Sequence, residues 1–232
     1  MKTEKNSSFF EQVRGRLIVS CQALPEEPLH SSFIMGRMAH AAFLGGAAGI
    51  RANTTEDIRE IRRTVDLPII GIIKRVYEEQ PELYITPTMR EVAELVDSGV
   101  EVIAMDATGR TRPGGGTITD FFPLIRKKYP DQLFMADCSS IEEGMKAAEL
   151  GFDLIGTTLA SYTPYTAGCA LPPYDMIEYL VKHSGKDVVA EGNIWSPAEL
   201  RRAMDIGILT AVVGSAITRP MEITKRFVRA LA

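Results

Sequence analysis

Cysteine and histidine are scarce in this sequence, and neither residue type is grouped. The three cysteines, Cys21, Cys138 and Cys169, form an odd number and lack the short spacings of a metal-binding motif. The three histidines are scattered as well. The cysteines and histidines therefore predict no zinc or iron site. Cysteines in this pattern are typical of free thiols in a reducing compartment, so we expect a cytoplasmic protein.

Long hydrophobic runs and an excess of positive charge are also missing. The most apolar stretch, residues 39–50, is interrupted by His40 and glycines and is too short to span a bilayer. Residues 1–6 lead into no apolar segment of the signal-peptide type. The formal net charge is −4. This balance argues against nucleic acid or an anionic membrane as the main partner.

What the sequence does have is a regular alternation of short apolar runs and helical segments. Its 232 residues are 45% hydrophobic, which is enough for a sizeable core. No linker divides the chain, so we expect one domain over residues 1–232, with an extra helix within residues 1–15. The predicted strands are residues 17–22, 47–52, 68–74, 101–106, 133–137, 153–157, 187–191 and 209–213.

Helical segments occupy the stretches between these strands, including one from about residue 36 to residue 45. Residues 75–87 have no clear period and are expected to be irregular. Strict alternation of strand and helix predicts a parallel sheet. Eight units in this length fit a closed (β/α)₈ TIM barrel. A doubly wound open sheet is the alternative, but no glycine-rich dinucleotide signature follows the first strand.

Polar residues stand at the carboxyl ends of most predicted strands, where barrel enzymes have their active sites. Lys74 ends an apolar strand, and burial at such a position favours the neutral amine, which is a usable base. The alternative is a lysine whose amine reaches water. Strands three and seven lie nearly opposite in a ring of eight, so Lys74 and Glu191 are expected to face each other. That pair suits proton removal on one face of a substrate and proton delivery on the other, although a simple ion pair is also possible.

Arg51, Asp137 and Gln22 stand at further strand ends and are candidates for substrate binding. For Arg51 and Asp137 the alternative is a structural salt bridge. Asp106 completes this set of strand-end residues. Buried charges without partners are costly, so these groups are expected to pair with one another or with a ligand.

Short glycine turns follow the last two predicted strands, at Gly192-Asn193 and at Gly214-Ser215. Barrels often bind phosphate after strands seven and eight, and Arg219 adds a cation suited to it. Further cations are expected at the mouth of the barrel: Arg51, Lys74, Arg75, Arg110 and Arg112. A cationic mouth in an acidic chain predicts a small anionic substrate. The loop over residues 108–116 is either a lid or a surface loop.

Nine short motifs, in order from Leu17 to Pro220, resemble the N-acetylmannosamine-6-phosphate 2-epimerase family of sialic acid breakdown. They are residues 18–22, 49–52, 71–75, 85–88, 105–108, 135–139, 156–159, 190–194 and 213–220. The resemblance implies a (β/α)₈ barrel without metal or nicotinamide that acts on a sugar phosphate. It further implies Lys74 as the catalytic base with Glu191 as its partner, and Arg51, Asp137 and Arg219 as substrate contacts. The family often forms dimers, so a homodimer is expected.

Two other functions remain open from the residues alone. One is a phosphate-binding barrel lyase or decarboxylase in which Lys74 forms a Schiff base. The other is a sugar-phosphate sensor without catalysis, against which the presence of both Lys74 and Glu191 argues. Borohydride trapping distinguishes the imine route from epimerisation.

Overall fold

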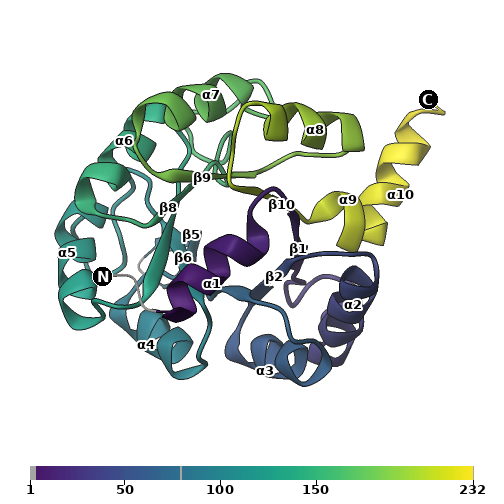
Figure 1. Cartoon of the computed structure of the whole chain (residues 1–232), viewed down its shortest axis with the longest axis horizontal. Helices are drawn as coiled ribbons and strands as arrows, with labels where there is room; N and C mark the ends of the chain where they lie inside the picture. The colour runs from purple at the N-terminus through teal and green to yellow at the C-terminus, as the bar shows by residue number, and fades with distance from the viewer. Residues whose placement is uncertain (1–3, 79, 232) are drawn as a thin grey trace.

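A closed barrel of eight parallel strands forms the centre of the protein, in a computed structural model that describes residues 4–78 and 80–231 (Figure 1). The order around the ring is β1-β10-β9-β8-β7-β6-β3-β2. The predicted (β/α)₈ barrel is therefore confirmed, and so is the opposition of β3 and β9. The barrel strands are β1 (Leu17–Cys21), β2 (Gly49–Asn53), β3 (Ile69–Ile72), β6 (Val102–Asp106), β7 (Leu133–Asp137), β8 (Leu154–Gly156), β9 (Asp187–Glu191) and β10 (Thr210–Val213).

Helices surround this ring on the outside (Figure 1). They are α2 (Ser32–Leu44), α3 (Thr55–Thr64), α4 (Met89–Asp97), α5 (Ile118–Lys128), α6 (Ile141–Leu150), α7 (Tyr174–His183), α8 (Pro197–Asp205), α9 (Ser215–Thr218) and α10 (Pro220–Arg229). Capping boxes at Thr88, Ser140 and Ser196 start three of them, each closed by a glutamate three residues later. Helix α2 begins at Ser32, four residues before the predicted start near Gly36. None of the described helices is long and apolar enough to cross a membrane.

Two apolar layers form the core. The outer layer lies between strands and helices, whereas the inner layer fills the barrel with side chains such as Ile18, Ile70 and Leu154. The extra N-terminal helix, α1 (Glu4–Val13), adds Phe9, Phe10 and Val13 to the inner layer. It lies across one end of the barrel in Figure 1. That end is therefore closed by apolar side chains.

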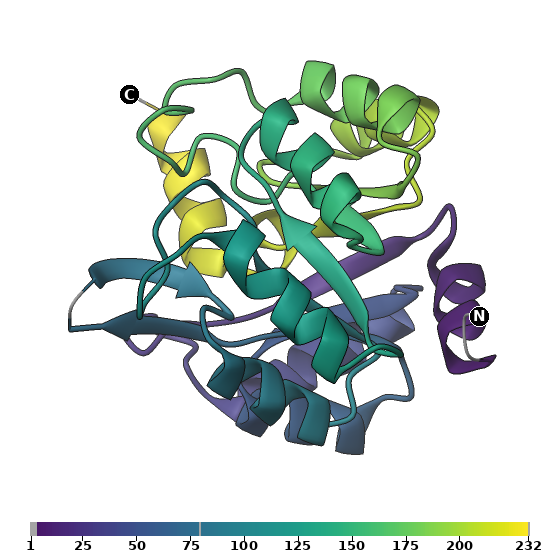
Figure 2. The same ribbon diagram turned by 90° about the vertical axis from the view of Figure 1, so that its left-hand side faces the viewer.

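The prediction of an irregular segment over residues 75–87 was wrong. Strands β4 (Lys74–Tyr77) and β5 (Gln80–Ile85) form an antiparallel hairpin at the carboxyl end of β3. Figure 2 shows this hairpin at the left, on the side away from α1. An ion pair between Arg75 and Glu91 fastens it to α4, and the Tyr77 hydroxyl donates to the same carboxylate at 2.7 Å. Lys74 is thus the residue at which the chain leaves the barrel and enters the hairpin.

Helix α10 differs from the other long helices because it has no buried residue. Figure 1 shows it projecting from the ring at the C-terminal end of the chain. The side chains of Phe227 and Val228 are 74% and 59% exposed. This helix therefore presents an apolar surface to its surroundings.

Candidate active site

A cavity of about 730 Å³ opens at the carboxyl ends of the barrel strands. Among its lining residues are most of those predicted from the sequence: Gln22, Lys74, Glu191, Gly192, Asn193, Gly214, Ser215 and Arg219. Arg51 and Asp137 do not line it. Ser20, Arg110, Thr158 and Trp195 also contribute to its wall. Residues from the first strand to the last therefore meet in one space, as the barrel topology requires.

Lys74 reaches this cavity from the first position of β4, directly after the turn that follows β3. The pKa of its amine is lowered from an ordinary value of 10.5 to about 8, mainly by burial and in addition by the nearby positive charges of Arg51 and Arg219. Glu191 and Asp137 act in the opposite direction. Among the hydrogen bonds and ion pairs of the described residues, none involves the Lys74 side chain. The amine is therefore available for a ligand and loses its proton far more easily than a surface lysine does.

Behind the cavity wall, Arg51 joins two carboxylates from different strands. Its guanidinium donates to Asp137 at 2.7 and 3.1 Å and to Glu191 at 2.9 Å. Arg51 and Asp137 are 1% and 0% exposed. Gly156 on β8 packs closely beside Asp137 and Met135, because a Cβ there would lie 3.3 Å from Asp137 Oδ1 and 2.3 Å from Met135 Cε. The guanidinium of Arg51 and the carboxylate of Asp137 therefore bind each other. That either residue contacts the substrate stays a prediction.

Glu191 connects this ion-pair cluster to the cavity. Burial raises the pKa of its carboxyl group above the ordinary value, while Arg51 lowers it and Asp137 raises it again. Thr158 Oγ1 lies 2.6 Å from Asp137 Oδ1 and 3.3 Å from Glu191 Oε2, so a single hydroxyl connects both carboxylates. Glu191 is thus held in place while it remains a possible proton donor near neutral pH.

The side of the cavity near β9 and β10 has the features expected of a phosphate site. Gly192 and Asn193 both have positive φ, 110° and 56°, which turns the chain sharply after β9. Arg219 lines the same cavity and is oriented by Glu27, whose carboxylate accepts from Arg219 Nη2 at 2.9 Å. A guanidinium held beside two short glycine turns suits a phosphate group, because it offers several fixed N–H donors.

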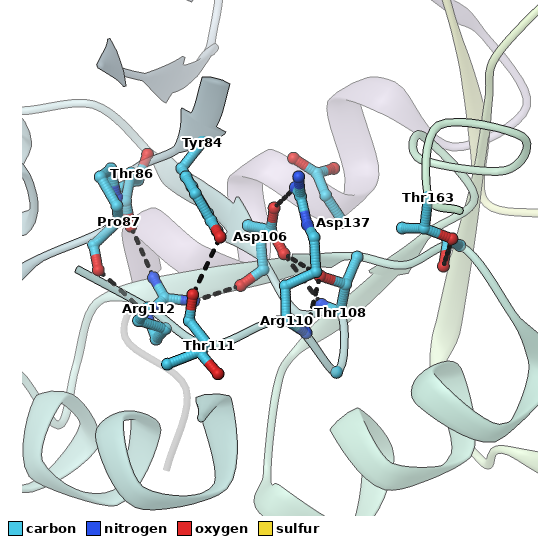
Figure 3. Close-up of polar contacts among 12 residues, drawn as sticks. Tyr84, Thr86, Pro87, Asp106, Thr108, Arg110, Thr111, Arg112, Asp137 and Thr163 are labelled. Carbon is cyan, nitrogen blue, oxygen red and sulfur yellow. Dashed lines mark hydrogen bonds and ion pairs between the residues drawn. The ribbon is translucent and has the colours of Figure 1, made fainter. Parts of the chain in front are cut away.

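The expected cationic mouth was only partly correct. Arg110 lines the cavity, although it also forms an ion pair with Asp106 at the end of β6. Arg112 is 3% exposed and donates to the backbone carbonyls of Thr86, Pro87 and Asp106 instead of facing the cavity (Figure 3). Arg110 and Arg112 therefore stabilise loops, because they donate to carbonyl and carboxylate oxygens at the ends of strands.

Arg75 likewise pairs with Glu91 and Glu94 on α4 and lies outside the cavity lining. The positive charge that remains at the cavity wall comes from Lys74, Arg110 and Arg219.

Gln22 has one polar atom that no described residue satisfies. Its Nε2 donates to Ser20 Oγ at 2.7 Å, whereas its buried Oε1 has no hydrogen-bond partner. Because an unpaired buried acceptor is costly, this oxygen is well suited to accept from a bound ligand. Within the described part of the chain, no group of three or more His, Cys, Asp or Glu residues could hold a metal ion.

Sequence reasoning missed two functional contacts. Thr158 follows β8 in the motif over residues 156–159, and its threonine at a strand end was the available signal. Glu27 follows Glu26 in a proline-containing loop, and nothing in its spacing pointed to Arg219, which is 192 residues away.

Comparisons with known proteins agree with this geometry. A family model described as "Putative N-acetylmannosamine-6-phosphate epimerase" (NanE) matches residues 35–232. A curated relative with the corresponding 2-epimerase name, from Clostridium perfringens strain SM101, is 55% identical over 215 residues, covering 93% of this chain and 96% of the relative. Another from Listeria innocua is 51% identical over 223 residues, covering 95% and 96%.

Solved structures are similar too. That of the N-acetylmannosamine-6-phosphate 2-epimerase from Clostridium perfringens superimposes with a TM-score of 0.89 at 53% identity, covering 95% of each chain. A thiamine phosphate pyrophosphorylase from Pyrococcus furiosus shares the fold alone, with a TM-score of 0.60 at 16% identity. With a barrel, a lysine–glutamate pair across its mouth and a relative of this similarity over nearly its whole length, the chain belongs to the NanE family of N-acetylmannosamine-6-phosphate epimerases.

Proposed function

We propose that this protein interconverts N-acetylmannosamine 6-phosphate and N-acetylglucosamine 6-phosphate, as an N-acylglucosamine-6-phosphate 2-epimerase. The observation that carries the proposal is the cavity in which Lys74 lies opposite Glu191, with Arg219 at the same wall. The substrate's phosphate binds at Arg219 and the turns at Gly192 and Gly214. The open-chain sugar then extends toward Lys74.

Proton transfer at C2 is the central step. The C1 carbonyl of the open-chain sugar acidifies the C2 proton, and neutral Lys74 removes it. A lysine whose pKa is lowered to about 8 is neutral often enough for this role near neutral pH. Reprotonation from the other face inverts C2. Either Glu191 supplies that proton, or Lys74 returns it after the intermediate has turned.

The source of the returning proton can be measured with substrate that carries deuterium at C2. Transfer by Lys74 alone leaves part of this deuterium in the product formed in ordinary water. Delivery by Glu191 replaces it with hydrogen from solvent.

Product formation from N-acetylmannosamine 6-phosphate, followed by NMR, tests the assignment of the base. Lys74→Ala is expected to abolish turnover while the circular dichroism spectrum stays unchanged. Lys146, a half-exposed lysine on α6, provides the matched control, and Lys146→Ala should keep the wild-type rate. A Lys74→Ala variant with near-normal activity would refute the role of Lys74.

An imine route is the second candidate chemistry, because a lysine with a lowered pKa is also a good nucleophile toward carbonyl carbon. A lyase or decarboxylase that uses Lys74 in this way is trapped by borohydride as a permanent adduct on that residue. Epimerisation by proton transfer leaves no adduct.

We further propose that the protein is a cytoplasmic homodimer. Two of its three free cysteines are buried and one is exposed, a state that a reducing compartment preserves. Helix α10 has no buried residue and exposes Phe227 and Val228, so a second copy of the chain is a suitable cover for this apolar surface. Analytical ultracentrifugation tests the dimer. A Phe227→Asp, Val228→Asp variant should sediment as a monomer.

A further inference from the structure

The chain turns out of the barrel at Ile73, immediately before Lys74, and Thr86 holds that turn. The Thr86 N–H donates to Ile73 O at 2.8 Å, and the Ile73 N–H donates to Thr86 Oγ1 at 3.3 Å. Both backbone polar groups of Ile73 are therefore bound by one residue. The same hydroxyl donates to Ala104 O on β6 at 2.7 Å. The turn is thus connected to a neighbouring barrel strand through a single oxygen atom.

Thr86 has a backbone conformation that threonine rarely adopts. Its φ is 49°, in the left-handed region, and its side chain is fully buried. A β-branched residue in this region is strained, and it persists only where its surroundings determine it.

Arg112 helps to hold Thr86 in this conformation, and Figure 3 shows its contacts. Its guanidinium donates to Thr86 O at 2.9 Å, to Pro87 O at 3.0 Å and to Asp106 O at 2.6 Å. The guanidinium also lies 4.6 Å from the centre of the Phe121 ring. Arg112 therefore fixes the backbone on which Thr86 stands, although it does not line the cavity.

The position of the Lys74 amine depends on this backbone. The Lys74 N–H donates to Asn53 Oδ1 at 2.9 Å, and Lys74 pairs with Ile85 at the start of the hairpin. The described residues offer its side chain no hydrogen bond or ion pair that would hold it from the other end. The direction of the Lys74 side chain is therefore set by its backbone, to which the turn at Ile73 contributes together with Asn53 and Ile85.

We propose that Thr86 is a positioning residue for proton transfer: its hydroxyl and backbone amide fix the turn at Ile73, so that Lys74 reaches C2 of the substrate opposite Glu191. This inference rests on the proposed role of Lys74 as the base. A small displacement of a reacting group, of the order of 1 Å, can reduce a rate by about 100-fold. Loss of the Thr86 hydroxyl frees the Ile73 N–H and the Ala104 carbonyl, and the turn relaxes.

The test compares three variants for their rate of C2 epimerisation. Thr86→Val keeps the shape and removes the hydroxyl, whereas Thr86→Ser restores it. Thr210→Val is the matched control. Thr210 lies at the amino end of β10, is also fully buried and donates a hydrogen bond of 2.6 Å to Arg16 O. Thr86→Val is expected to lower kcat about 10- to 100-fold with KM within about twofold. Thr86→Ser and Thr210→Val should stay within about threefold of wild type in kcat.

A second readout needs no catalysis. The pH dependence of Lys74 acetylation by acetic anhydride, followed by mass spectrometry of the peptide, reports the pKa of this amine. The charged groups that face it, Arg51, Arg219, Glu191 and Asp137, are unchanged in all variants. In Thr86→Val the pKa should rise from about 8 toward the ordinary 10.5, since a freed amine gains solvent. In Thr210→Val it should not move.

The proposal is overturned if Thr86→Val matches Thr210→Val in both kcat and Lys74 pKa. Should Thr86→Val fail to fold, Arg112→Lys performs the same test, because one amine cannot reach all three carbonyls. Its kcat and its Lys74 pKa should then change in the same directions. An absence of epimerisation in the wild type would instead refute the proposed function, and the acetylation experiment would still decide whether Thr86 positions Lys74.

Discussion

Replacing Lys74 by methionine should stabilise the protein, although it removes the proposed base. In the folded state the pKa of Lys74 is lowered from 10.5 to about 8, mainly by burial. Each pKa unit corresponds to about 1.4 kcal/mol, so holding the charged amine in this site lowers the free energy of unfolding by about 3.5 kcal/mol. Methionine has a similar length and needs no solvation of a charge.

The sign and the pH range follow from linkage. Above pH 10.5 the amine is neutral in both folded and unfolded chains and has no cost. As the pH falls from 10.5 to about 8, the unfolded chain binds the proton first, so wild-type stability falls relative to the methionine variant. Below about pH 8 the amine is charged in both states and the full difference is present.

Urea unfolding of both proteins in steps from pH 7.5 to pH 10.5 measures this difference, over a range that starts close to the lowered pKa of about 8. Lys146→Met is the control, since that side chain is 50% exposed and its replacement should change stability by less than about 0.5 kcal/mol at every pH. A difference in free energy of unfolding between wild type and Lys74→Met that does not vary with pH would refute a lowered pKa for Lys74.

Three further predictions concern the same site. The rate of epimerisation should rise with pH up to about 8, because Lys74 acts in its neutral form, and a rate that falls over this range would contradict that role. Arg51→Met should lower the free energy of unfolding by about 3–5 kcal/mol in urea titrations, since Asp137 and Glu191 lose their shared partner. A loss below about 1 kcal/mol would show that water solvates the two carboxylates instead. Arg219→Ala should raise KM for the sugar phosphate about 10- to 100-fold, while KM for the phosphate-free sugar hardly changes. Equal effects on both KM values would show that the phosphate does not bind at Arg219.

The barrel was predictable because its signals are local and repeated. Each strand is a short apolar run, and several helices begin with a capping residue such as Thr88 or Ser140. The closed ring then places strand ends together, so the sequence alone brought Lys74 and Glu191 to opposite sides of one cavity. Their assigned chemical roles remain predictions.

The hairpin and the pairing of charges were not predictable in the same way. Strands β4 and β5 lack a clear alternation, and contacts from Tyr77 to α4 and from Thr86, directly after β5, to β6 hold them in place. Arg112 was expected at the mouth of the barrel, yet its partners are backbone carbonyls up to 26 residues away in the chain. Partners of this kind carry no sequence signal, because every residue has a carbonyl group.

The most direct test of the account is proton NMR of N-acetylmannosamine 6-phosphate with the enzyme in D₂O. The C2 proton signal should be lost from the N-acetylglucosamine 6-phosphate that forms, completely if Glu191 delivers deuterium from solvent and in part if Lys74 returns the proton it removed. Lys74→Ala should show neither product nor exchange. Product that forms with its C2 proton fully retained, or no product at all from the wild type, would contradict proton transfer at C2 as the function of this cavity.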